Sequence, residues 1–78
     1  MMNQAVLFND DLIFDELQDA WRFTVLVSGQ RITIFFHSTK LKQLEEIDSN
    51  TKFDLEEIVE IWLEENEPEG NIIHINMC

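Results

Sequence analysis

The sequence predicts a single α+β domain over residues 1–78, in which a mainly antiparallel four-stranded sheet carries two helices packed on one face. Three observations predict this class. Residues 21–38 hold two β-branched and aromatic runs around a glycine, which is typical of a β-hairpin. Residues 53–65 space their apolar side chains as an amphipathic helix does. The segments follow in the order β-β-β-α-α-β, and this grouping favours an α+β layer over a parallel sheet.

The residues before the hairpin predict one short strand and a connection. The run AVLF at residues 5–8 has the composition of a strand. Residues 9–20 are acidic with scattered apolar side chains, and we expect them to form a loop with one helical turn.

The hairpin pattern indicates which of its faces is the core. A two-residue type II′ turn at Gly29 and Gln30 would pair Val25 with Ile34, since that turn takes glycine first. Because side chains alternate along a strand, one face is wholly apolar and is expected to be buried: Trp21, Phe23, Val25, Val27, Ile32, Ile34 and Phe36. The reverse face is mixed, which suits partial exposure: Arg22, Thr24, Leu26, Thr33, Phe35 and His37.

Two helices and a last strand are expected after the hairpin. Ser38 is the candidate N-cap of a short helix over residues 39–47, whose inward side chains would be Leu41, Leu44 and Ile47. Residues 48–52 predict a polar break. The alternation in residues 71–77 predicts the final strand.

The longer helix carries its own start signal and its own apolar stripe. Asp54 as N-cap with Glu57 resembles a capping box, and Phe53 with Ile58 would form a hydrophobic staple. The expected buried stripe is Leu55, Ile58, Val59 and Trp62, with Glu56, Glu60 and Glu64 on the opposite side. Asn66, Pro68 and Gly70 should end the helix.

The charge balance limits the classes of partner. Five Lys and Arg against sixteen Asp and Glu give a formal charge of −11, which disfavours direct binding of nucleic acid or of an anionic membrane and favours a basic protein surface. Residues 53–70 hold eight acidic residues and no basic one. The candidate acidic interaction surface is Glu56, Glu60, Glu64, Glu65, Glu67 and Glu69.

No motif in the chain predicts catalysis, a metal or a cofactor. Carboxylates on one exposed helix face diverge, whereas a calcium site needs oxygens that converge. Neither an HExxH pair, a GxSxG elbow nor a glycine-rich phosphate loop is present. His37, beside Ser38, and His74 are expected to pack or hydrogen-bond within the sheet. The single Cys78 is expected to be a frayed terminal residue without an intrachain disulfide.

The start of the sequence and its apolar runs bear on the location of the protein. The first residues, MMNQAVLF, lack a basic start and a long apolar run, and no stretch of eighteen apolar residues exists. We therefore expect a cytoplasmic protein without membrane contact, present as a monomer or a weak homodimer.

Several segments together resemble a bacterial family of short acidic proteins, domain of unknown function 1488. They are NQAVLF followed by ND, the hairpin WRFTVLVSGQRITI, and the helix FDLEEIVEIWLEEN leading to GNIIHI. Asn9 stands where the family usually has proline, Phe14 where it has tryptophan, and residues 42–52 lack part of a helix that typically carries an arginine. The resemblance implies an α+β fold, a bacterial or phage-related cytoplasmic origin and no established activity.

Three functional hypotheses remain. The first is a non-enzymatic domain that acts by protein contact. The second is an acidic mimic of nucleic acid, such as a phage-type inhibitor that occupies the channel of a basic nucleic-acid-binding protein. The third is a small hydrolase or metal enzyme. The arrangement of the carboxylates separates them, because a mimic needs a charged ridge and an enzyme needs acids that converge in a cleft.

Overall fold

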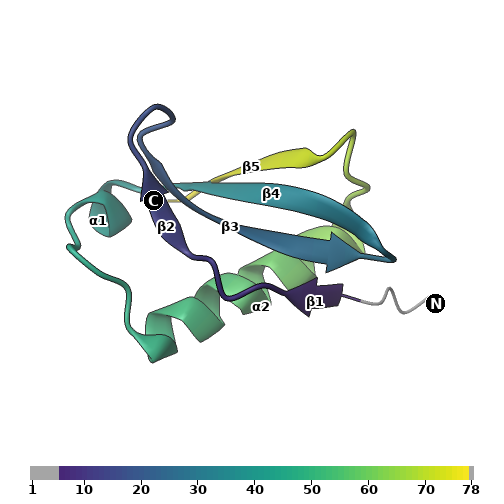
Figure 1. The fold of residues 1–78 in the computed structure, drawn as a ribbon, viewed down its shortest axis with the longest axis horizontal. Helices are drawn as coiled ribbons and strands as arrows, with labels where there is room; N and C mark the ends of the chain where they lie inside the picture. The colour runs from purple at the N-terminus through teal and green to yellow at the C-terminus, as the bar shows by residue number, and fades with distance from the viewer. Residues whose placement is uncertain (1–5, 78) are drawn as a thin grey trace.

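The computed structural model describes residues 6–77 and shows a curved sheet with one long helix beneath it (Figure 1). The strands are β1 (Val6–Phe8), β2 (Ile13–Asp15), β3 (Ala20–Val27), β4 (Gln30–His37) and β5 (Ile72–Asn76), and the helices are α1 (Thr39–Lys42) and α2 (Ser49–Glu65). The α+β class is confirmed. The sheet differs in detail from the prediction, because it has five strands and is mixed, with β5 parallel to β4.

The hairpin formed by β3 and β4 has the predicted core face but another register. On the reverse face, where partial exposure was expected, Thr24 and Phe35 are buried. Ser28 and Gly29 form the two-residue turn, and both have positive φ, 50° and 86°, which is the type I′ pattern. Val25 therefore faces Ile32 and not Ile34. The shift is two residues, so every side chain keeps its face. All seven residues of the predicted core face are buried in the hydrophobic core.

The segment before the hairpin contains a strand that the sequence analysis missed. Val6–Phe8 of the predicted first strand is β1, while Ala5 lies outside the described residues. Within residues 9–20, where a loop was expected, β2 pairs with the first half of β3, and β1 pairs with its second half. Strand β2 is only three residues long, too short to give a pattern against its acidic surroundings.

The first helix is shorter than predicted. Ser38 is its N-cap, since the Ser38 side chain accepts a hydrogen bond from the Leu41 N–H at 3.2 Å. Leu41 is buried, and its carbonyl accepts a hydrogen bond of 2.7 Å from the indole of Trp21. Leu44 is 44% exposed, contrary to expectation, because α1 ends at Lys42 before a full second turn can form.

The long helix α2 begins earlier than its sequence signals indicated. Asp48 is the N-cap and accepts a hydrogen bond of 2.8 Å from the Thr51 N–H, which holds the pKa of Asp48 below its ordinary value. The expected polar break at residues 48–52 is therefore the start of the helix, and the N-cap assignment to Asp54 was wrong. Phe53 is 64% exposed, so no hydrophobic staple forms.

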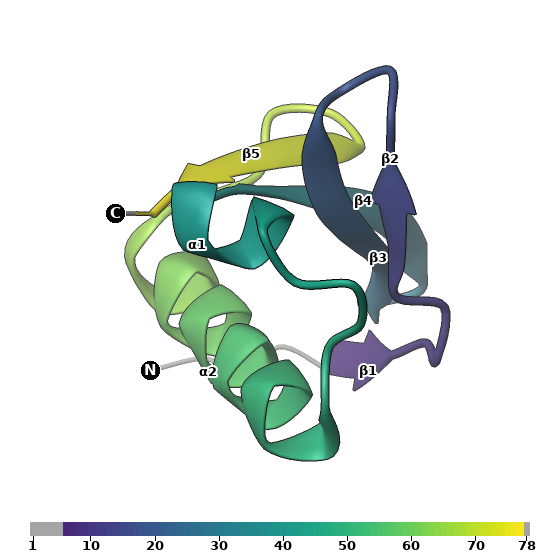
Figure 2. The same ribbon diagram turned by 90° about the vertical axis from the view of Figure 1, so that its left-hand side faces the viewer.

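The buried stripe of α2 is rotated from the one predicted. Leu55, Val59 and Leu63 are buried, at the four-residue spacing that keeps side chains on one helix face. Ile58 and Trp62 are only half-buried and pack against the edge of this core. Figure 2 shows α2 running beneath the sheet with α1 at one end. No helix within residues 6–77 has the length and apolar content needed to cross a bilayer.

Candidate acidic interaction surface

The basic residues of the chain all precede its most acidic segment, residues 53–70, along the sequence. All five Lys and Arg fall between Arg22 and Lys52. Three of them neutralise carboxylates of the N-terminal half, with N···O distances of 2.7–3.2 Å: Arg22 with Asp15, Lys42 with Asp19 and Lys52 with Asp10. The acids in the second half of α2 and in the loop after it therefore have no basic neighbour along the chain.

Glu56 does not belong to the exposed acidic surface. Its carboxylate is half-buried on the flank of α2 and lies 4.0 Å from the ammonium of Lys52. The same ammonium donates a 2.7 Å hydrogen bond to Asp10, which raises the pKa of Lys52 and lowers the pKa of Asp10. Glu56 was expected opposite the core, but it lies only about 60° around the helix from the centre of the buried stripe. Lys52 compensates its charge locally.

The remaining candidate residues share an exposed position, and together we call them the acidic tip: Glu60, Glu64, Glu65, Glu67 and Glu69. Within residues 6–77, none of them forms an ion pair. The last turn of α2 contains no basic residue. Negative charge at this end of a helix opposes the helix dipole, so the acidic tip lowers the stability of α2.

The C-terminus of α2 is capped without help from the acidic tip. The backbone N–H of Asn66 donates to the Trp62 carbonyl at 2.9 Å, and the Asn66 side-chain amide donates to the same oxygen at 3.1 Å. The helix therefore ends by side-chain and backbone hydrogen bonding, and the glutamates project from it without a structural partner among the described residues.

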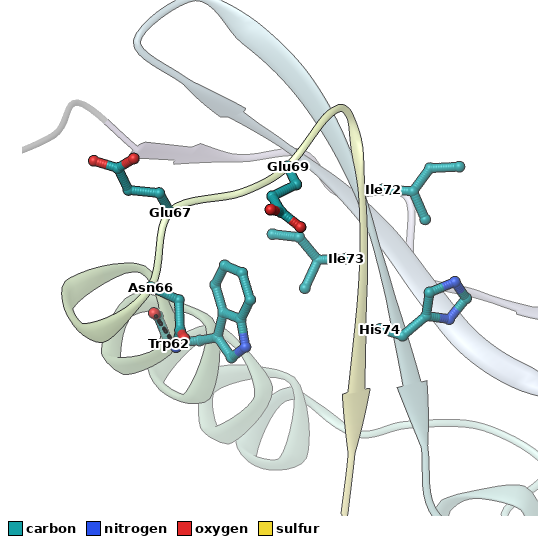
Figure 3. A pocket seen from close by; sticks show the side chains of 7 residues that line it. All are labelled: Trp62, Asn66, Glu67, Glu69, Ile72, Ile73 and His74. Carbon is teal, nitrogen blue, oxygen red and sulfur yellow. Dashed lines mark hydrogen bonds between the residues drawn. The ribbon is translucent and has the colours of Figure 1, made fainter.

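A shallow open hollow of ≈ 430 Å³ lies between the end of α2 and β5 (Figure 3). Its lining combines two glutamates of the acidic tip with apolar and polar side chains: Trp62, Asn66, Glu67, Glu69, Ile72, Ile73 and His74. In Figure 3, Trp62 and Ile73 lie on one side of β5, and Ile72 and His74 lie on the other. Trp62 was expected in the core, but it is only half-buried here because α2 presents Leu63 to the sheet instead.

The two histidines meet on the outer face of the sheet. His37 Nε2 and His74 Nδ1 are 2.8 Å apart and share a hydrogen bond, and His74 also stacks on Phe35 with ring centroids 5.2 Å apart. This confirms that both histidines pack and hydrogen-bond within the sheet. Ser38, by contrast, is used as a helix cap. The sequence did not indicate the His37–His74 contact, because it depends on the parallel register of β5.

The chemistry that the acidic tip offers is electrostatic attraction. Among the described residues, no three His, Cys, Asp or Glu side chains lie close enough together to hold a metal ion. Cys78 lies outside the described residues. The exposed carboxylates on the end of α2 diverge, which suits contact with an extended cationic surface better than chelation of a small ion.

No known family model, curated protein or solved structure matches this chain.

Proposed function

We propose that this protein is a non-enzymatic binding domain that recognises a basic protein surface through the acidic tip. The observation that carries the proposal is the uncompensated charge of the tip. Five exposed glutamates gather at the end of α2 and in the following loop, and no Lys or Arg occurs after Lys52. The fold gains no stability from these charges, so a role outside the fold accounts for them better than a structural one.

The physical effect of such a tip is on association. Complementary charge steers two proteins together and raises the rate of encounter, and it discriminates against acidic partners. A net charge of −11 adds a long-range attraction toward any basic protein. Salt shortens the range of this attraction to about 10 Å at 0.1 M, so the proposed interaction should weaken steeply as salt is raised.

The experiment compares two triple variants with the same net charge. One variant, Glu64→Gln, Glu65→Gln and Glu67→Gln, removes charge from the tip. The control, Glu16→Gln, Glu45→Gln and Glu46→Gln, removes three exposed charges elsewhere. Wild-type protein is immobilised on a support and incubated with a bacterial lysate. It should retain basic proteins at low salt and release them at high salt. The tip variant should lose these proteins while the control keeps them.

Equal behaviour of the two variants would contradict the proposal, because it would assign binding to net charge alone. Capture that is insensitive to salt in all three proteins would also contradict it. Both variants should be shown to be folded by circular dichroism before the comparison, and their substituted side chains are exposed, so the fold should be kept.

Mimicry of nucleic acid is the second candidate, and one observation favours it. Glu57, Glu60 and Glu64 are all exposed on the outer side of α2, and a rise of 1.5 Å per residue places them about 4.5 and 6 Å apart along the axis. Such a row repeats negative charge along one line, as a phosphate strand does, although at a wider spacing than the about 3.4 Å of one DNA strand. A captured protein that binds DNA or RNA, and that loses this binding when the acidic protein is added, would favour mimicry over the wider class of basic partners.

A further inference from the structure

One edge of the sheet is formed by β5, and its backbone groups are open. The Asn71 carbonyl accepts a hydrogen bond from the Thr33 N–H, and the Met77 N–H donates to the His37 carbonyl. In a parallel pair, alternate residues direct their N–H and C=O toward the same neighbour. The backbone N–H and C=O groups of Ile72, His74 and Asn76 therefore point away from β4. Among the described residues, β5 has no strand on that side (Figure 2).

Residues 72–76, which form this edge, lack the side chains that usually protect an edge against an added strand. Natural edges are commonly blocked by charged side chains, by proline, by a bulge or by a covering segment. Residues 72–76 read Ile-Ile-His-Ile-Asn and contain no charged carboxylate, lysine, arginine or proline. Ile72 is 51% exposed. The edge is thus continuous over five residues and has the composition that accepts a further strand.

The surroundings of the edge indicate what would pair with it. The hollow described above runs beside β5, with Glu67 and Glu69 near its start and the half-buried Trp62 at its side. Two carboxylates favour cations, and an indole face suits an apolar group or a cation. A second copy of this chain fits poorly, since two molecules with a charge of −11 each repel one another.

We propose that the β5 edge receives an extended segment of the partner as an additional strand. This segment carries lysine or arginine beside Glu67 and Glu69 and an apolar side chain against Trp62. Its main chain bonds to the open groups of Ile72, His74 and Asn76, as in other cases of strand addition. The inference rests on the proposed function, a basic partner, and it specifies the conformation of that partner and the place where it binds.

The probe is a labelled synthetic peptide of alternating lysine and valine, KVKVKVK, followed by fluorescence anisotropy. Its control is KPKVKPK, which has the same charge but in which proline prevents a regular strand. Wild-type protein should bind the first peptide at least about tenfold more tightly, because the loss of one or two net hydrogen bonds changes affinity by roughly that factor. Amide hydrogen exchange in wild-type protein should slow at Ile72, His74 and Asn76 when KVKVKVK is bound.

Two substitutions at one position test the edge itself. Ile72→Pro removes an outward N–H and obstructs a neighbouring strand at the first residue of β5, where proline is tolerated. Ile72→Val keeps the edge and serves as the matched control. KVKVKVK should bind the valine variant as it binds wild type and should bind the proline variant about tenfold more weakly. Should Ile72→Pro fail to fold, hydrogen exchange in wild-type protein decides whether the peptide pairs with β5.

The outcomes separate this inference from the proposed function. Equal binding of the two peptides, with loss of binding in the variant Glu64→Gln, Glu65→Gln and Glu67→Gln, would overturn strand addition and leave the acidic tip as the binding site. Unchanged exchange at all three β5 amides in the bound state would overturn it as well. Absence of binding of either peptide to any form at low salt would count against both proposals.

Discussion

The two edges of the sheet are built in opposite ways. On one edge, β1 and β2 are three residues each and share the long strand β3, with a break between them at residues 9–12. On the other edge, β5 runs without interruption for five residues beside β4. The first edge has acidic side chains in and around its break, whereas the second has none within the strand. Among the described residues, the second edge is therefore the longer uninterrupted one.

The broken edge is completed by side chains. At the break, the Thr24 N–H donates to the Asp11 carboxylate at 2.9 Å, and the Thr24 hydroxyl donates to the other oxygen of Asp11. Asn9 adds a backbone bond to the Thr24 carbonyl at 3.0 Å and a side-chain bond to its hydroxyl at 2.8 Å. The backbone and hydroxyl groups of the buried Thr24 thus all have hydrogen-bond partners. Such partners are needed because a buried polar group left unpaired costs free energy. The difference teaches that side chains can satisfy the backbone of an inner strand where its neighbouring strand is interrupted.

The largest expected effect tests whether only the inner face of β5 supports the core. Ile73 is 3% exposed and Ile72 is 51% exposed on the same strand. Ile73→Ala should lower the free energy of unfolding by about 2–5 kcal/mol, because it leaves a cavity, whereas Ile72→Ala should change it by only about 0.5 kcal/mol. Urea denaturation measures both. Similar losses at the two positions would mean that the outer face of β5 is also structural.

The next effect concerns the broken edge. Asp11→Ala removes the acceptor of both Thr24 donors and should cost about 1–3 kcal/mol, the cost of a buried group left unpaired. Asp11→Asn keeps a carbonyl oxygen for the N–H and should restore most of that loss. Faster hydrogen exchange of the Thr24 amide in the alanine variant would locate the effect. If Asp11→Ala were as stable as wild type, water would be an adequate substitute at this edge.

Acid should weaken the broken edge through Asp15, the last residue of β2. A hydrogen bond from the Gln18 N–H, with help from Arg22, holds the pKa of Asp15 below its ordinary 3.8. Because the folded pKa is the lower one, this carboxylate stabilises the fold fully above pH 3.8 and loses that contribution as pH falls through the folded pKa. The stability difference between wild type and Asp15→Asn, from urea midpoints across pH, should therefore shrink in acid. A difference that is constant with pH would contradict the assignment.

The smallest expected effect lies beside the open edge, in the acidic tip. Glu60 and Glu64 are exposed and four residues apart on α2, where like charges repel by about 0.2–0.5 kcal/mol. Replacing both by Gln should raise stability by about that amount at low salt, and the gain should fade as salt is added. The pair Glu45→Gln and Glu46→Gln, outside any helix, is the control and should gain less. Unfolding of the Glu60 and Glu64 variant would show that these carboxylates are structural.

The sequence by itself determined which face of the hairpin is buried and where the charge lies. Strand alternation requires no knowledge of the partner strand, so the core face of the hairpin was predicted although its register was not. The exposure of the five glutamates of the acidic tip was also predicted, because glutamates without nearby basic residues remain exposed in most folds. The predicted exposure of Glu56 was wrong. The N-cap of α2 was missed, since both Asp48 and Asp54 carry a cap signal and only packing against the sheet selects between them.

The tertiary structure decided everything that depends on pairing between distant segments. The turn at Ser28 and Gly29, the strand β2 and the parallel pairing of β5 each compete with alternatives that have the same local pattern. Some contacts join residues that are distant in the sequence. His37 and His74 are separated by 37 positions, and Asp11 and Thr24 by 13 positions. Their geometry arises only when the strands have taken their register, because hydrogen bonds are made over about 3 Å and local residue patterns do not determine distances between remote residues.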